Sequence, residues 1–232
     1  LWDSSELDVC RLRQENGIQP VYKMIDTCAS EFESYVPYFY STYEDENESV
    51  VTKNKKIIVL GAGPIRLGQG VEFDYSTVHA IWAIRKAGFE AIIIHNKPET
   101  VSTDYTSSDK LYYGPLCVED GMNVIGLEQP DGVIVTLGGQ TAINLAARLD
   151  ALGVPTVGTG CEAIDRAQNR ASFAMLTALQ GIPRPQGKAV PNLGVRASAA
   201  AALGYPALSP PPSALGGHVL PLVHDDAARL HS

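Results

Sequence analysis

Glycine residues that follow a buried strand are the part of this chain best suited to chemistry. The apolar run at 57–60 is typical of a parallel strand, and it leads into GAGPIRLGQG at 61–70. Gly61 and Gly63 let the backbone approach a ligand closely, and the helix expected beyond them offers unpaired N–H groups and a positive dipole end. The pattern predicts a turn suited to an anion. A turn that only packs a helix onto a sheet is the alternative.

Two common glycine motifs do not fit this turn. A dinucleotide fingerprint needs a third glycine where Arg66 stands, and an acidic residue at the end of the second strand, where His95 and Asn96 stand. A P-loop needs Lys and Ser or Thr where the chain has Gln69 and Gly70. The turn is therefore expected not to bind NAD, and the residues by themselves support an α/β crevice.

Strand and helix patterns alternate from 55 to about 158. They predict strands at 56–60, 91–95, 110–113, 132–137 and 154–157, and helices at about 75–87, 118–128 and 140–152. This order predicts the α/β class, with a mostly parallel Rossmann-like sheet and helices on both faces. Ligands bind such sheets at the carboxyl ends of the strands, where 61–70, 96–105 and the GGQT sequence at 138–141 fall.

Carboxylate and hydroxyl side chains gather in the second of these loops and directly after the first. The sequence NKPETVSTDY at 96–105 could cap a neighbouring helix or hydrogen-bond a substrate. Glu72 and Asp74 could form a carboxylate pair for acid–base chemistry or for a metal, or could simply favour the start of a helix. Both questions stay open at the level of the sequence.

The first 52 residues have a different pattern. A short helix is expected at 5–16, with Ser5 as its N-cap and Gly17 after its end. The segment 20–43 is rich in aromatic residues without periodicity, so we expect an irregular lead-in that packs across the outside of the α/β domain. An acidic linker follows at 44–49.

Composition narrows the class of partner. The net charge of −8 and the absence of a Lys/Arg cluster argue against nucleic acid and against an anionic membrane surface, so a small-molecule partner is expected. No apolar run reaches the length of a membrane span. The four cysteines are too far apart for a Cys-x-x-Cys pair, and the five histidines lack metal-ligand spacing. A cytoplasmic protein with reduced thiols is the expectation.

Three long stretches resemble the large subunit of carbamoyl-phosphate synthetase: GAGPIRLGQGVEFDYSTVHA at 61–80, HNKPETVSTDY at 95–105 and GGQTAINLA at 138–146. The segment 17–33 is similar to the lead-in to the second, carbamoyl-phosphate-forming half of that subunit. The resemblance implies a fragment: the end of the oligomerisation region at 1–52, a pre-ATP-grasp domain at 53–165 and part of an ATP-grasp domain at 166–232.

The same resemblance implies a function. In that family ATP phosphorylates carbamate to carbamoyl phosphate, with Mg²⁺, for arginine and pyrimidine biosynthesis, and a glutamine amidotransferase small subunit is the partner. Carried onto this sequence, Gly70 lines the passage for carbamate, while Arg170, Gly216 and Gly217 contact the nucleotide. No residue is assigned as catalytic or as a metal ligand, and the isolated chain is expected to be inactive.

The resemblance fails in the tail. Pro210, Pro211 and Pro212 stand where the family has a strand with a second nucleotide-binding arginine, and three consecutive prolines cannot form an interior strand. A function of another class therefore stays open, that of a non-catalytic nucleotide- or anion-binding α/β module. A degenerate piece that only packs against a partner is a third possibility.

Overall fold

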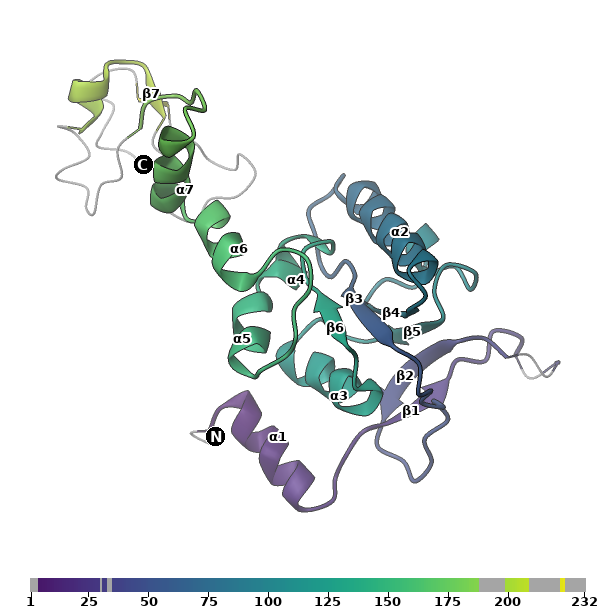
Figure 1. The fold of residues 1–232 in the computed structure, drawn as a ribbon. Coiled ribbons are helices and arrows are strands. Elements are labelled where there is room, and N and C mark those ends of the chain that lie inside the picture. Colours follow the sequence, from purple (N-terminus) through teal and green to yellow (C-terminus); the bar gives the residue numbers. More distant parts are fainter. Residues whose placement is uncertain (1–3, 30, 33–34, 188–198, 209–221, 224–232) are drawn as a thin grey trace. The chain divides into compact units, whose positions relative to one another are not determined.

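A computed structural model of the chain describes residues 4–29, 31–32, 35–187, 199–208 and 222–223 (Figure 1). The chain divides into two compact units, Leu1–Cys161 and Glu162–Ser232. The candidate site lies in the first unit, because both glycine-rich loops, at 61–70 and 138–141, belong to it.

A six-stranded sheet forms the centre of the first unit. Its strands are β1 (Val21–Met24), β2 (Tyr38–Thr42), β3 (Lys56–Leu60), β4 (Glu90–His95), β5 (Lys110–Tyr113) and β6 (Gly132–Ile134). Their order across the sheet is β1-β2-β5-β4-β3-β6, and every neighbouring pair is parallel except β1 with β2. The predicted α/β class with a mostly parallel sheet is confirmed.

Helices cover both faces of this sheet (Figure 1). The helices of this unit are α1 (Glu6–Glu15), α2 (Gly70–Lys86), the 3-10 helix η1 (Val101–Thr103), α3 (Val118–Glu128), α4 (Gly139–Ile143) and α5 (Ala146–Ala151). On one face, Ile81 and Ile84 of α2 pack against Ile57, Val59 and Ile93 of the sheet. On the other face lie α3 and α5. The continuous apolar runs of β3 and β4 follow from this arrangement, because these two strands are buried on both sides.

A buried charged cluster fixes the amino-terminal ends of the strands. Glu128 accepts hydrogen bonds from Lys56 Nζ at 2.8 Å, from Lys110 Nζ at 2.7 Å and from the Tyr112 hydroxyl. Burial acts to raise the pKa of Glu128, but these donors outweigh it and hold the pKa below its usual range. The two lysines also donate to the carbonyl groups of 50 and 52, so the cluster ties the preceding linker to the sheet.

The aromatic N-terminal segment differs from the expectation. It packs against the α/β domain as predicted, but it does so as two added strands instead of an irregular lead-in. Phe39 of β2 is fully buried, and the Tyr22 ring meets Tyr112 edge-on at 4.9 Å. Aromatic residues suit such half-covered strands. The helix before this segment was predicted correctly, since Ser5 caps α1 and Gly17 follows it with φ +72°.

Four elements near the candidate site have other limits than predicted. Strand β6 ends at Ile134 instead of at 137. Helix α2 begins at Gly70 instead of about 75, because Val71 and Glu72 of its first turn are exposed and the turn lacks the apolar periodicity on which the prediction rested. The expected helix at 140–152 is divided into α4 and α5 at Asn144–Leu145. The expected strand at 154–157 is a single bridge between Thr156 and Val133, where Pro155 has no N–H to donate.

The second unit contains α6 (Cys161–Gln168), α7 (Arg170–Leu179) and a short antiparallel pair, β7 (Ala207–Leu208) and β8 (Leu222–Val223). Asn169 caps α7 by accepting hydrogen bonds from the amides of Ala171 and Ser172. The prolines at 210–212 lie outside the described residues. Among the residues that the structure describes, no helix is long and apolar enough to cross a bilayer.

Candidate functional site

The chain reverses its direction of travel across the sheet at β3. From β3 it passes to β4 and then β5 on one side, and then α3 carries it back to β6 on the other side of β3. In open parallel sheets the crevice at such a switch point, outside the carboxyl ends of the strands, is the usual place for a ligand. The glycine loop at 61–70 starts at that end of β3.

Close backbone contacts join the glycine loop to the GGQT loop after β6. A Cβ atom on Gly138 would overlap the carbonyl oxygen of Gly61, and one on Gly63 would lie 2.6 Å from Cγ2 of Thr141. The Thr141 hydroxyl donates a hydrogen bond of 2.6 Å to the carbonyl of Pro64. The glycines therefore allow close packing between the two loops. The fold brings together the two loops that were predicted from the sequence.

His95 joins the loop after β4 to the same edge. Its ring is 1% exposed and rests where a Cβ on Gly61 would have to be. Its Nδ1 accepts the backbone N–H of Lys97 at 2.9 Å. Burial, aided by the charge of Lys97, lowers the pKa of His95 to about 4, although Asp74 acts in the opposite direction. The imidazole is therefore neutral at physiological pH. It packs between the glycine loop at 61–70 and the loop that follows β4.

Asp74 connects α2 to the loop after β4. Its two carboxylate oxygens accept the backbone N–H groups of Val101 at 3.1 Å and Ser102 at 2.9 Å. Burial acts to raise the pKa of Asp74, but hydrogen bonds from residues 100–102 outweigh it and hold the pKa below its usual range. Glu72 is exposed. The role of Asp74 is thus to fix the loop, and the alternative of a paired acid–base site has no support in this geometry.

The hydroxyl-rich loop at 96–105 largely hydrogen-bonds itself. Thr103 Oγ1 accepts the N–H of Thr100 at 3.0 Å, and Asp104 accepts from both the N–H and the hydroxyl of Thr106. Ser107 Oγ donates to the carbonyl of Val101 at 2.6 Å. These oxygens therefore stabilise the loop itself, which differs from both sequence interpretations, the capping of a neighbouring helix and a contact with a substrate.

Gly70 occupies the first position of α2 and is half-buried. A Cβ atom there would lie 3.3 Å from Nζ of the exposed Lys97. An ammonium group beside a helix N-terminus gives two positive features at one place, which suits an anion. Lys97 was not singled out in the sequence, although its position directly after a strand within the 95–105 stretch was the available signal.

The predicted nucleotide contacts belong to the second unit, whereas this edge belongs to the first. Arg170 is the exposed first residue of α7 in the second unit. Gly216 and Gly217 lie outside the described residues. Within the described part of the chain, no three His, Cys, Asp or Glu side chains gather as a metal site. The described residues therefore do not form a site for Mg²⁺.

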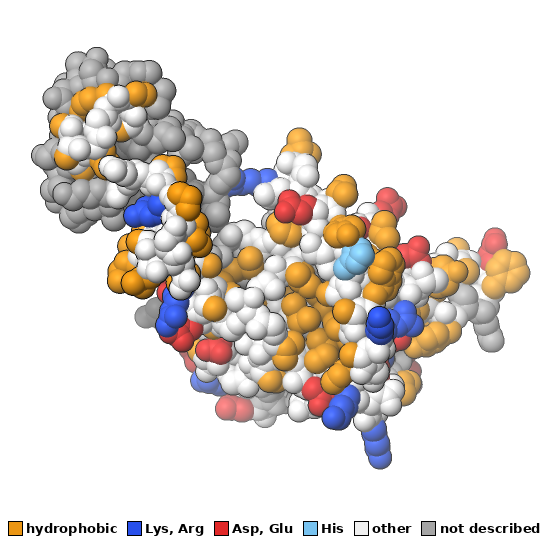
Figure 2. All heavy atoms as spheres, turned by 45° about the horizontal axis from the view of Figure 1, so that its top comes forward, with side chains coloured by type: hydrophobic (Ala, Val, Ile, Leu, Met, Phe, Trp, Pro, Cys, Tyr) orange, Lys and Arg blue, Asp and Glu red, His pale blue; other side chains and the backbone are white. Residues whose placement is uncertain are grey.

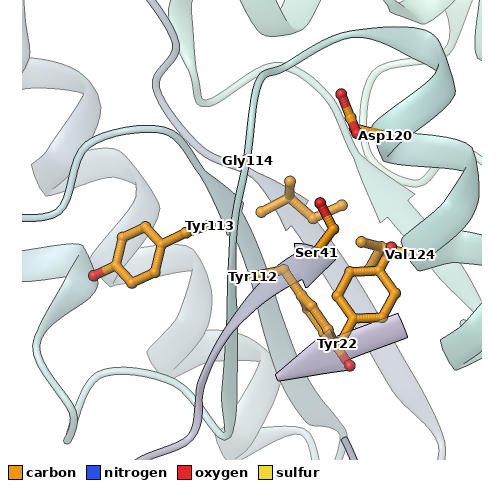
Figure 3. A pocket seen from close by; sticks show the side chains of 8 residues that line it. Tyr22, Ser41, Tyr112, Tyr113, Gly114, Asp120 and Val124 are labelled. Atoms are coloured by element: carbon orange, nitrogen blue, oxygen red, sulfur yellow. The ribbon is translucent and has the colours of Figure 1, made fainter. Parts of the chain in front are cut away.

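A small hollow lies between β1, β2, β5 and α3 (Figure 3). Tyr22, Ser41, Tyr112 and Val124 line it, while the Tyr113 ring points away on the other side of its strand. Its volume of about 10 Å³ holds one water molecule. A hollow of this size is a packing feature between edge strands and helix, and it is too small for a nucleotide.

The sheet order, the switch point and the glycine-rich loops define an α/β domain of the pre-ATP-grasp type, with a fold that also occurs in biotin carboxylase domains. Residues 53–166 match the family model described as the carbamoyl phosphate synthase pre-ATP-grasp domain. This segment is therefore similar to the pre-ATP-grasp domain of carbamoyl phosphate synthases.

Solved structures show the same fold at low identity. One is the biotin carboxylase domain dimer of Hydrogenobacter thermophilus 2-oxoglutarate carboxylase, in complex with MgADP, ADP and bicarbonate. It is 16% identical in sequence and has a TM-score of 0.57. The match covers 77% of this chain and 40% of that one. Campylobacter jejuni biotin carboxylase in a β,γ-ATP complex is 15% identical with a TM-score of 0.56, over 75% and 39%. This chain thus spans less than half the length of either protein.

Proposed function

We propose that this chain is part of the large subunit of a carbamoyl-phosphate synthetase, and that its α/β domain serves the ATP-dependent phosphorylation of carbamate to carbamoyl phosphate. The observation that carries the proposal is the meeting of two loops at one edge of the sheet. Both belong to stretches that resemble the synthetase, and they touch through Gly61, Gly63 and Gly138. The match of residues 53–166 to the pre-ATP-grasp family model supports it further.

In this proposal the glycine edge conducts an anion. Carbamate carries a negative charge, and Lys97 beside the N-terminus of α2 would favour it there without any group that reacts with it. Gly70 leaves room at this place because it has no side chain. Its role is thus to line the passage by which carbamate reaches the second phosphorylation site.

The nucleotide and Mg²⁺ belong to the complete enzyme. Phosphoryl transfer depends on positioning and on neutralising the charge of the phosphates, which Mg²⁺ and cationic side chains supply when bound. Arg170, Gly216 and Gly217 are the proposed nucleotide contacts from this chain. The metal ligands would come from residues beyond those that the structure describes.

The remaining parts of the proposal follow from the resemblance. A glutamine amidotransferase small subunit would supply ammonia, the product would serve arginine and pyrimidine biosynthesis, and the enzyme would act in the cytoplasm. The competing function is an anion-binding module without chemistry. The same pair of Lys97 and the α2 N-terminus favours it equally, so the test must measure turnover.

A domain graft provides that test. Residues 53–166 replace the corresponding domain in the second half of a synthetase of known activity, and ATP formation from ADP and carbamoyl phosphate is measured. Bicarbonate-dependent ATP hydrolysis in the unaltered first half is the control for folding. We expect the graft to retain ATP formation. A graft that keeps the first-half activity but forms no ATP from carbamoyl phosphate would contradict the proposal.

A further inference from the structure

The outer face of α2 carries a row of exposed aromatic residues. Tyr75 and Trp82 are 64% and 56% exposed, and His79 lies between them. Figure 2 shows hydrophobic side chains gathered over this helix beside an exposed histidine. The α2 ridge, as we define it, consists of Glu72, Tyr75, Ser76, His79, Trp82, Ala83 and Lys86. The opposite face of the helix is buried against the sheet.

The ridge is assembled before any partner arrives. The His79 ring lies 4.2 Å from the Tyr75 ring and 5.0 Å from the Trp82 ring, measured between centroids. Isolated exposed apolar residues are common on protein surfaces, but pre-ordered aromatic residues are the type enriched at the centre of interfaces. Their order lowers the entropy that a partner would have to remove on binding. These side chains are therefore suited to association.

The ridge is complementary to itself when two copies run antiparallel. With a two-fold axis beside His79, positions equally distant from 79 face each other. Tyr75 then meets Ala83 of the second copy, and Trp82 meets Ser76 of the second copy, so each large side chain faces a small one. His79 of one copy then faces His79 of the other at the crossing point.

The charged residues of the ridge also fit the two-fold axis beside His79. Glu72 stands seven positions before His79 and Lys86 stands seven positions after it, so Glu72 of each copy faces Lys86 of the other. A parallel arrangement would instead place like charges together. The sizes and the charges of the ridge side chains thus both favour an antiparallel pairing with a second copy.

We propose that the α2 ridge is a docking surface for a second copy of this chain, in an antiparallel two-fold pair of α2 helices. The proposal does not depend on the proposed function. A single helix pair is a small interface beside the roughly 1,200–2,000 Å² buried in stable complexes, so the dimer is expected to be reversible and concentration-dependent.

Sedimentation velocity of the full 232-residue chain across a concentration series tests the pairing. We expect a reversible monomer–dimer equilibrium, and Trp82→Ala to weaken dimerisation by about tenfold or more, as for an aromatic residue at the centre of an interface. Phe32→Ala is the matched control, because Phe32 is an aromatic residue with 73% exposure outside the ridge. A wild-type chain that stays monomeric up to its solubility limit would overturn the proposal.

A charge exchange tests the orientation. Glu72→Lys and Lys86→Glu should each weaken self-association, because each variant alone brings like charges together. An equimolar mixture of the two should dimerise, since every contact then joins opposite charges. Circular dichroism of each variant controls for loss of the helix. Mixtures that associate no more than the separate folded variants would rule out the antiparallel pairing.

Discussion

His95 stays neutral beside Gly61 because a charged imidazole would lose its hydration there. Its folded-state pKa of about 4 lies below the ordinary value of 6.5, so its contribution to stability is present above pH 6.5 and is lost as the pH falls toward 4. The full shift corresponds to about 3 kcal/mol. We expect wild-type protein to lose that much more unfolding free energy between pH 7 and 4 than His95→Asn, as measured by urea denaturation. Equal losses would show that His95 is not held neutral.

Gly138 has to be glycine, because a side chain at this position would overlap the backbone of Gly61. We expect Gly138→Ala to cost about 1–3 kcal/mol of unfolding free energy, as overpacking does, because the Gly61 carbonyl cannot turn aside. Gly126→Ala in α3 is the control. A Cβ atom on Gly126 meets nothing within 4 Å, and the change should stabilise the helix by about 0.5–1 kcal/mol. Similar effects of both changes in denaturant titrations would mean that the two loops do not touch.

Among the elements, those with strong local patterns were predictable. The strands at 56–60 and 110–113 and the helix at 118–128 agree with the structure, because continuous apolar runs and capped amphipathic segments are visible in single windows of sequence. The two N-terminal strands were not predictable. Their place depends on long-range parallel pairing of Tyr38 with Leu111, for which no local pattern exists. The local sequence pattern thus predicts where a helix or strand occurs, whereas the pairing of strands depends on the topology of the whole domain.

The same division applies to the candidate site. The glycine turn and the GGQT loop were recognised by residue type, and their contact follows from the carboxyl ends of parallel strands lying at one edge. The closeness of Lys97 to Gly70 depends on where α2 begins, and that boundary was misplaced because the first turn lacks apolar periodicity. Resemblance to a family supplied a role for Gly70 that no local property indicates.

Strand β2 provides the test at the element scale. If residues 38–42 are an integral part of the sheet, Phe39→Ala should cost about 3–5 kcal/mol, the range for buried Phe in a core. Tyr40→Ala, in the same strand but 42% exposed, should cost far less. Chemical denaturation measures both. Equal, small effects would indicate that the segment is a loosely attached lead-in.

The whole 232-residue chain should not form carbamoyl phosphate by itself. An ATP-grasp site needs two further subdomains, whereas the second unit, Glu162–Ser232, has about the size of one small domain. We expect no Mg²⁺-dependent ATP formation from ADP and carbamoyl phosphate by the purified chain, above the level of an Arg170→Ala control. Turnover that depends on Arg170 would show that this unit carries a complete site.

The most direct test of the central claim uses Gly70 in an intact synthetase that carries this sequence. A phenyl ring at this position would block a conduit, since only the movable end of Lys97 lies near, and it removes no phosphate contact. For Gly70→Phe we expect overall carbamoyl-phosphate synthesis to fall at least about tenfold, or about 1.4 kcal/mol in activation free energy, more than ATP formation from carbamoyl phosphate and ADP. Gly70→Ala should leave both activities nearly unchanged. Equal loss of both activities in Gly70→Phe would contradict the passage and indicate misfolding instead.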